Sequence, residues 1–107
     1  MIAATPEPPY YAVIFTSVRT LQDDAGYSEM AEEMVTLAKK QDGFLGIESA
    51  RNETGITVSY WRSMEDIRTW KENERHLIAQ KKGKEKWYQA YKLRICKVEK
   101  DYDFTLL

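Results

Sequence analysis

The sequence predicts an α+β domain in which four strands and two helices follow the order βαββαβ. Three observations lead to this prediction. Residues 10–18 and 44–62 are rich in β-branched and aromatic residues, which is typical of strands. Residues 27–41 and the stretch after Ser63 repeat apolar residues at helical spacing, and residues 92–104 begin as an alternating strand. This order is the signature of a ferredoxin-like sandwich, in which both helices cover one face of a four-stranded antiparallel sheet.

One domain accounts for most of the chain. The chain has 107 residues, of which 43% are hydrophobic, enough for a single hydrophobic core. All three prolines lie within residues 1–9, which predicts an extended N-terminal arm. We expect a single domain over residues 10–107.

Charge and cysteine content narrow the class of protein. Lys and Arg number 16 and Asp and Glu number 17, so the net charge of −1 argues against a nucleic-acid partner. The single cysteine, Cys96, excludes an internal disulfide and fits a reducing compartment. The sequence shows neither an apolar run of roughly 20 residues nor a signal peptide. We therefore expect a cytoplasmic protein without a membrane partner.

The first half of the chain predicts a strand, a helix and a hairpin. Residues 10–18 have almost no polar face, which predicts a strand buried on both faces. Residues 27–41 predict an amphipathic helix that ends at Asp42-Gly43. Residues 44–52 and 55–62 predict two strands joined by a hairpin turn.

The second helix begins with a capping signal. Ser63 is placed to cap the N-terminus, with Asp66 three residues later as in a capping box. Gly83 interrupts the helix, and residues 84–91 predict another short helical turn.

The last strand and the uncovered sheet face predict a second subunit. Residues 92–104 change their alternation after Cys96-Lys97, which predicts a bulge. Thirteen residues would span roughly 43 Å, well beyond a strand of about 20 Å, so we expect the end to reach a partner. Ile56 and Val58 add apolar side chains to a sheet that the helices cover on one face only. We infer a homodimer packed sheet to sheet about a two-fold axis.

The segments GFLGIES, SYWRSMEDIRTW and WYQAYKLRICKVEKDY, in this order and spacing, carry a family resemblance. Over residues 10–104 the chain resembles the antibiotic biosynthesis monooxygenase family of dimeric α/β barrels. The resemblance implies a dimer whose sheets form a barrel and a pocket between sheet and helices in each subunit. It also implies oxygenation of aromatic polyketides or quinol precursors by molecular oxygen without metal or flavin, and heme degradation in some members.

The heme-degrading branch of that family carries an Asn on the first strand, a Trp on the second helix and a His ten residues after the Trp. Trp70 matches the Trp, but Gln80 occupies the position of the His, and His76 lies one helical turn earlier. The first strand offers Thr16, Ser17 and Val18 where the Asn is expected. One of the three functional residues therefore carries over.

His76 is the only histidine and the candidate catalytic residue. It is interpreted either as an exposed helix residue near Glu72 or as a proton acceptor at the pocket mouth, because imidazole titrates near neutral pH. On a continuous helix it would lie about 240° from Trp70, so the second interpretation requires a break near Asn73-Glu74. With one histidine and no thiolate cluster, no metal is expected.

Trp70 and Tyr60 are the candidate substrate-binding residues. Trp70 lies on the apolar stripe of its helix, where an aromatic residue packs in the core or lines a pocket. Tyr60 and Trp61 point to opposite faces of their strand, and alternation alone leaves open which one faces the helices. Cys96 is expected to be a small buried residue without a catalytic role.

Three functional hypotheses follow. In the first, the protein is a small cofactor-independent monooxygenase acting on an electron-rich aromatic, quinol or polyketide-like substrate. Trp70 and Tyr60 would hold the substrate, and His76 would accept its proton. In the second, the same pocket belongs to a non-catalytic module that binds a small molecule or heme. In the third, the protein degrades heme.

Overall fold

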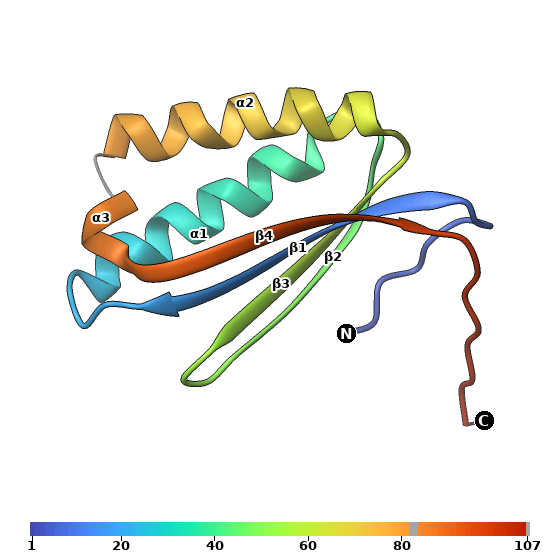
Figure 1. Cartoon of the computed structure of the whole chain (residues 1–107), viewed down its shortest axis with the longest axis horizontal. Helices are drawn as coiled ribbons and strands as arrows, with labels where there is room; N and C mark the ends of the chain where they lie inside the picture. Colours follow the sequence, from blue (N-terminus) through green and yellow to red (C-terminus); the bar gives the residue numbers. More distant parts are fainter. Residues whose placement is uncertain (82–83, 107) are drawn as a thin grey trace.

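Four strands and two long helices follow one another in the predicted order (Figure 1). The computed structural model describes residues 1–81 and 84–106, with side chains described outside residues 79–85. The elements are β1 (Tyr10–Arg19), α1 (Asp24–Lys39), β2 (Phe44–Arg51), β3 (Gly55–Trp61), α2 (Met64–Lys81), α3 (Lys84–Trp87) and β4 (Tyr88–Val98).

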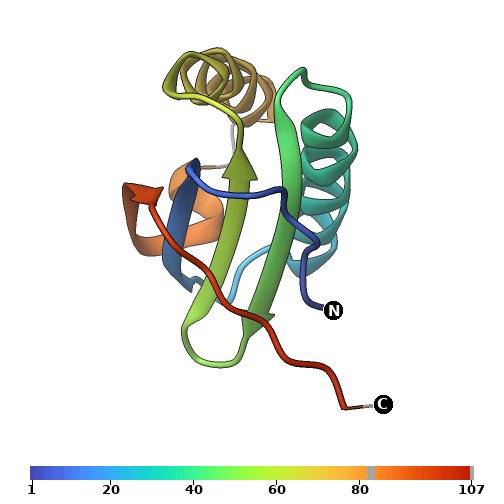
Figure 2. The ribbon, with the colours of Figure 1, turned by 90° about the vertical axis from the view of Figure 1, so that its right-hand side faces the viewer.

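The four strands form one antiparallel sheet in the order β2-β3-β1-β4, which is followed across the view in Figure 2. Strand β1 is central and pairs with β3 from Tyr11 opposite Trp61 to Ser17 opposite Gly55. Both α1 and α2 lie on one face of the sheet (Figure 1). The predicted ferredoxin-like α+β architecture is therefore confirmed.

The hydrophobic core fills the layer between the helices and the sheet. Its buried members come from four elements: Val13, Ala38, Trp61, Ile67 and Trp70. Each of them is at most 4% exposed, so the two tryptophans contribute most of the buried apolar area.

Strand β1 is less buried than its sequence predicted. On its outer face, away from the helices, Ile14 and Thr16 are only half-buried. Both helices pack against the other face, where Val13 and Ser17 are buried. The outer face of the sheet therefore remains partly apolar and uncovered by helices.

Helix α1 begins three residues earlier than predicted. Asp23 caps it in the left-handed conformation, with φ of 53°, and its carboxylate accepts a hydrogen bond of 3.3 Å from the Gly26 N–H. The predicted stop is close to the observed one, because the helix ends at Lys39 and Gly43 turns the chain with φ of 80°.

Helix α2 starts as its capping signal predicted. The Ser63 hydroxyl accepts a hydrogen bond of 3.1 Å from the Asp66 N–H and donates one of 2.8 Å to the Asp66 carboxylate. These contacts satisfy a backbone donor that the first turn leaves without a helical partner. The interruption predicted at Gly83 lies outside the described residues.

For the last part of the chain, one prediction is confirmed only in part, because α3 is the predicted helical turn but is shorter, and another was wrong. The helical turn predicted over residues 84–91 ends at Trp87, because Tyr88 already pairs with Arg19 of β1 and begins β4. The bulge predicted near Cys96-Lys97 is absent from the described β1–β4 ladder at those residues, where Lys97 pairs regularly with Tyr11. The alternation changes at Val98 because the strand ends there, and the register shifts at the other end, between Val18 and Arg19.

Both chain ends lie on the side of the sheet away from the helices (Figure 1). The Tyr10 hydroxyl donates a hydrogen bond of 2.5 Å to Asp101 and accepts one of 2.9 Å from Thr5. The Ala3 N–H donates a hydrogen bond of 2.9 Å to Glu48 on β2. The arm and the tail therefore cover one end of the outer sheet face. In the described part of the chain, no helix combines the length and apolarity needed to cross a membrane.

Candidate active site

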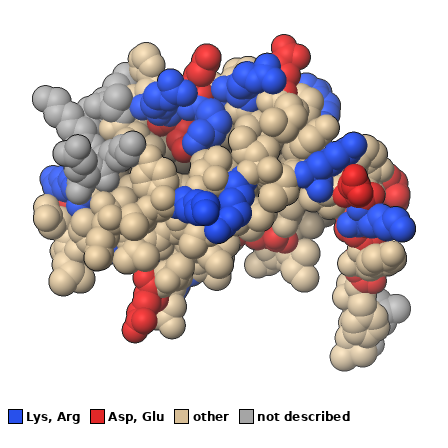
Figure 3. All heavy atoms as spheres, in the orientation of Figure 1, with Lys and Arg blue, Asp and Glu red and all other residues tan. Residues whose placement is uncertain are grey.

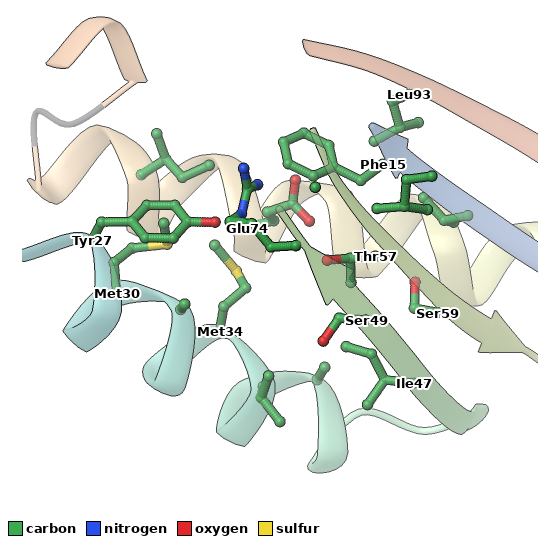
Figure 4. Close-up of a pocket in the computed structure, with 18 of the residues that line it drawn as sticks. Phe15, Tyr27, Met30, Met34, Ile47, Ser49, Thr57, Ser59, Glu74 and Leu93 are labelled. Atoms are coloured by element: carbon green, nitrogen blue, oxygen red, sulfur yellow. The ribbon is translucent and has the colours of Figure 1, made fainter. Parts of the chain in front are cut away.

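A cavity of about 300 Å³ lies between the two long helices and the sheet (Figure 4). This volume falls within the range of small-molecule sites. Most of its side chains are apolar and come from α1 and from the helix-facing positions of the strands: Val13, Phe15, Met30, Met34, Ile47 and Leu93. Such a lining favours a largely apolar ligand.

Small hydroxyl groups interrupt the apolar lining on the sheet side. Ser49 of β2 and Thr57 of β3 stand opposite each other in the ladder, and both side chains point into the cavity (Figure 4). Ser59 also lines the cavity, but its hydroxyl accepts a hydrogen bond of 2.9 Å from the Trp61 indole. Ser49 and Thr57 thus present hydroxyl groups to the cavity from the sheet.

Polar and charged groups gather at one end of the cavity. Arg51, Tyr27, Tyr88 and Glu74 all line it there. Burial raises the pKa of the Tyr88 hydroxyl, Tyr27 and Glu74 raise that pKa further, and Arg51 opposes them. Tyr88 therefore stays protonated at neutral pH and serves as a hydrogen-bond donor rather than a base.

Glu74 is the carboxylate that reaches the cavity from α2. Its side chain is 19% exposed, forms an ion pair of 3.1 Å with Lys71 and points toward the cavity (Figure 4). Glu74 is not among the site residues predicted from the sequence. A signal was available, because Glu74 follows Trp70 by four residues and so lies on the same face of a helix.

Trp70 lines the cavity, as the family resemblance implied. It is 4% exposed, and its ring stacks on Trp61 with centroids 5.6 Å apart. The two interpretations of Trp70, core packing and pocket lining, are therefore compatible, since the same ring packs in the core and lines the cavity. Whether it binds substrate stays a prediction.

Tyr60 is not brought together with Trp70. Its neighbours Ser59 and Trp61 face the helices, so alternation turns Tyr60 to the outer face. There its hydroxyl donates a hydrogen bond of 2.6 Å to Glu48, and burial together with that carboxylate raises its pKa to about 12. If Tyr60 binds a substrate, it does so outside this cavity, and its substrate-binding role stays a prediction.

His76 is exposed and does not line the cavity. Helix α2 runs without interruption through Asn73-Glu74, so the break that would turn His76 toward Trp70 is not observed. Its role as a proton acceptor stays a prediction that this arrangement does not favour. Cys96 is exposed on β4, so the expectation that it is a buried residue was wrong.

The residues present do not fit a heme or a metal ion well. Among the described residues, no group of three or more His, Cys, Asp and Glu side chains could hold a metal. The cavity lining contains neither His nor Cys, the commonest axial ligands of heme in oxygen chemistry. We therefore assign no step to either group.

Charged side chains outside the cavity are mixed in sign. On the face seen in Figure 3, Lys and Arg alternate with Asp and Glu along α2, and the described residues show no uniformly basic stripe there. This mixture gives nucleic acid no continuous positive surface on that face.

The ferredoxin-like fold and the cavity define a small α+β protein with an internal cavity between helices and sheet. The sequence profile of the monooxygenase af470-like family matches residues 15–96, and the chain belongs to that family. The uncharacterized protein YqjZ of Bacillus subtilis is 52% identical over 101 residues, which cover 92% of this chain and 88% of YqjZ. The resemblance to a family of monooxygenases is thereby confirmed.

Solved structures confirm the fold. A Caulobacter crescentus protein assigned to the antibiotic biosynthesis monooxygenases superposes with a TM-score of 0.71 at 11% identity, over 86% of this chain and 92% of that one. SnoaB of Streptomyces nogalater, described as a cofactor-independent oxygenase, superposes with a TM-score of 0.67 at 7% identity. That superposition covers 88% of this chain and 97% of SnoaB.

Proposed function

We propose that this protein is a small monooxygenase that acts within the cavity without a bound cofactor. Its substrate class is an electron-rich aromatic, quinol or polyketide-like molecule. The observation that carries the proposal is a mostly apolar cavity that holds one partly buried carboxylate, Glu74, beside the wall formed by Trp70. Membership in a monooxygenase family and the fold shared with SnoaB support it.

The reaction needs no reductant other than the substrate. A quinol and one molecule of oxygen give a hydroxyquinone and one molecule of water. One oxygen atom replaces a ring hydrogen, the other becomes water, and the quinol supplies all four electrons. Oxygen reacts slowly with a neutral quinol, so removal of a hydroxyl proton makes the ring a better reductant. The protein's task is to take that proton and shelter the anion from water.

Glu74 is the group we assign to proton transfer. Proton transfer needs a base within hydrogen-bond reach of the hydroxyl or connected to it through one water. Glu74 lines the cavity, whereas the candidate predicted from sequence, His76, is exposed on another face of α2. Trp70 would lie against the ring of the substrate, and Ser49 and Thr57 would offer hydrogen bonds to its oxygen atoms.

The assembly we propose is a homodimer formed through the outer face of the sheet. Ile14 and Val58 are half-buried there, and Ile56 is 46% exposed. The tail adds three exposed apolar side chains at alternate positions, Tyr102, Phe104 and Leu106. Burial of these groups against a second copy would stabilise both subunits. The cytoplasmic location also stays a prediction.

An isotope experiment tests the proposed reaction. The purified protein is incubated with 1,4-dihydroxynaphthalene under ¹⁸O₂. The products are then separated, and their masses and ¹⁸O content are determined by mass spectrometry. We expect 2-hydroxy-1,4-naphthoquinone carrying one ¹⁸O atom, with one molecule formed for each molecule of oxygen consumed. Uncatalysed oxidation gives 1,4-naphthoquinone and hydrogen peroxide instead, so the two reactions are distinguished by product as well as by rate.

The alternative outcome identifies a binding module. If the quinol saturates the protein but yields only unlabelled 1,4-naphthoquinone at the buffer rate, for this and for larger polycyclic quinols, the oxygenase proposal is wrong. The cavity would then serve to carry or sense its ligand.

A further inference from the structure

The side chain of Arg51 crosses the sheet at the polar end of the cavity. Arg51, Gly55 and Ser17 form one row of the ladder, on β2, β3 and β1 respectively. The guanidinium of Arg51 reaches across the middle strand and donates a hydrogen bond to the Ser17 hydroxyl. Ser17 is 1% exposed, so this hydrogen bond fixes the guanidinium against the inner face of the sheet.

The absence of a side chain at Gly55 makes this path available. A Cβ atom at Gly55 would stand 2.2 Å from the guanidinium carbon and 2.2 Å from one of its nitrogens. Any other residue at this position would therefore push the guanidinium off the sheet. Gly55 is buried beneath the Arg51 side chain, so the glycine and the arginine act as a unit.

The guanidinium carries donors that its described neighbours leave unused. A guanidinium has five N–H donors. Among the described residues its hydrogen-bond partner is Ser17, no carboxylate forms an ion pair with it, and the Tyr27 ring centroid lies 5.8 Å from its central carbon. Arg51 also lines the cavity. Arg51 is an exposed residue, so its guanidinium presents a positive charge with free N–H groups where this end of the cavity meets solvent.

We propose that Arg51, held over Gly55, binds an anionic oxygen of the ligand, so that the site selects aromatic molecules with an acidic hydroxyl group. The inference rests on the proposed function in taking the cavity as the substrate site. In that reaction the quinol gives its proton to Glu74 and becomes an anion, and the hydroxyquinone product is itself an acid. Arg51 would stabilise both anions through charge-assisted hydrogen bonds, while the apolar walls hold the rings.

A matched pair of probes tests the selection directly. The first probe, 2-hydroxy-1,4-naphthoquinone, is an anion at neutral pH, and the second, 2-methoxy-1,4-naphthoquinone, has the same rings without the charge. Each is titrated into the protein while quenching of tryptophan fluorescence is followed, because Trp70 lines the cavity. We expect the wild-type protein to bind the anion more tightly by roughly tenfold to a hundredfold, the usual strength of a hydrogen bond to a charged group.

Two substitutions remove the guanidinium by different routes. Arg51→Met keeps the length of the side chain without its charge, and Gly55→Ala leaves Arg51 in the chain but displaces it from the sheet. Both should abolish the preference for the anion while changing the affinity for the methoxy probe by about twofold or less. Arg68→Met removes an exposed arginine from α2 and should leave the preference intact. Thermal unfolding of each variant confirms that it is folded.

Failure of this inference is distinguishable from failure of the proposed function. Equal affinities of the wild-type protein for the two probes, or no saturable binding of the anion, would overturn the role of Arg51 even if quinol oxygenation is observed. The same loss of preference in Arg68→Met would also overturn it, since the effect would then reflect net charge. A strong preference without any oxygenation would support the anion site and contradict the monooxygenase.

Discussion

Glu74 and His76 lie two residues apart on α2 and face different surroundings. Glu74 is 19% exposed at its side chain and lines the cavity, whereas His76 is exposed and does not. A helix turns about 100° for each residue, so their side chains point roughly 200° apart. One helix thus offers two proton acceptors, of which only Glu74 faces the proposed substrate.

Substitution of these two residues separates their roles. Glu74→Gln preserves size and hydrogen bonding but cannot take a proton at neutral pH. General base catalysis contributes about 10²- to 10⁴-fold, so we expect the rate of hydroxynaphthoquinone formation to fall by at least about 100-fold. His76→Gln should retain the rate within about twofold, because its side chain is exposed outside the cavity.

The opposite pattern would restore the sequence-based hypothesis. A large loss in His76→Gln with a normal rate in Glu74→Gln would show that α2 presents His76 to the substrate during turnover. Loss in both variants would mean that both residues take part in moving the proton.

The stacked pair Trp61 and Trp70 connects the cavity to the stability of the fold. Their ring centroids are 5.6 Å apart, and the two residues are 0% and 4% exposed. Trp70→Ala removes a buried indole and should lower the free energy of unfolding by about 3–5 kcal/mol, a large fraction of the roughly 5–15 kcal/mol that stabilise a domain. Trp70→Phe should cost less, because one ring still stacks. Urea unfolding measures the free energy of unfolding of both variants. A Trp70→Ala variant as stable as the wild type would contradict the core role of Trp70.

The hydrogen bond from Tyr60 to Glu48 predicts an alkaline limit to stability. Burial raises the pKa of Tyr60 to about 12 in the folded protein, whereas an unfolded tyrosine titrates near 10. The folded state therefore keeps this proton longer. Its contribution to stability is complete below about pH 10 and is lost as the pH rises toward about 12.

Tyr60→Phe tests this dependence on pH. The free energy of unfolding of the wild-type protein should fall more steeply between about pH 10 and about pH 12 than that of the variant. Tyr102→Phe, at an exposed residue of the tail, should behave as the wild type. Parallel curves for the wild type and Tyr60→Phe would show that Tyr60 does not contribute to the alkaline loss.

The proposed dimer predicts a mass of twice the 12.5 kDa chain in light scattering. Val58 lies on the outer face of the central part of the sheet, so Val58→Asp would place a charge in the interface and should give monomers. Thr69→Asp adds the same charge to the exposed surface of α2 and should leave the dimer intact. A monomeric wild-type protein at micromolar concentration would refute the dimer.

The fold could be predicted from sequence because its signals are local. The Ser63–Asp66 cap, the hairpin turn between Arg51 and Gly55 and the helical stripe through Trp70 each depend on residues close in the chain. The last strand was predicted less well. Tyr88 belongs to β4 because it pairs with Arg19, a residue far away in the sequence.

The candidate site was only partly predictable, because it too depends on contacts between residues far apart in the sequence. The family resemblance identified Trp70, but alternation alone did not decide which face of β3 Tyr60 occupies. The position of Arg51 depends on three strands meeting at Gly55, and no pattern within one segment indicates it. His76 was predicted because imidazole is a common proton acceptor. Glu74 is favoured by the structure because it lines the cavity, whereas His76 does not.

Filling the cavity tests the central claim most directly. Thr57 points into it from the sheet (Figure 4), so Thr57→Phe would occupy the space of the proposed substrate, whereas the control Thr57→Ser keeps the hydroxyl and adds no volume. The measurement is the rate of ¹⁸O-labelled hydroxynaphthoquinone formation by the two variants, each first shown to be folded. We predict a rate close to that of the wild type for Thr57→Ser and no turnover for Thr57→Phe. Full activity in Thr57→Phe would place the reaction elsewhere on the molecule and contradict the proposed site.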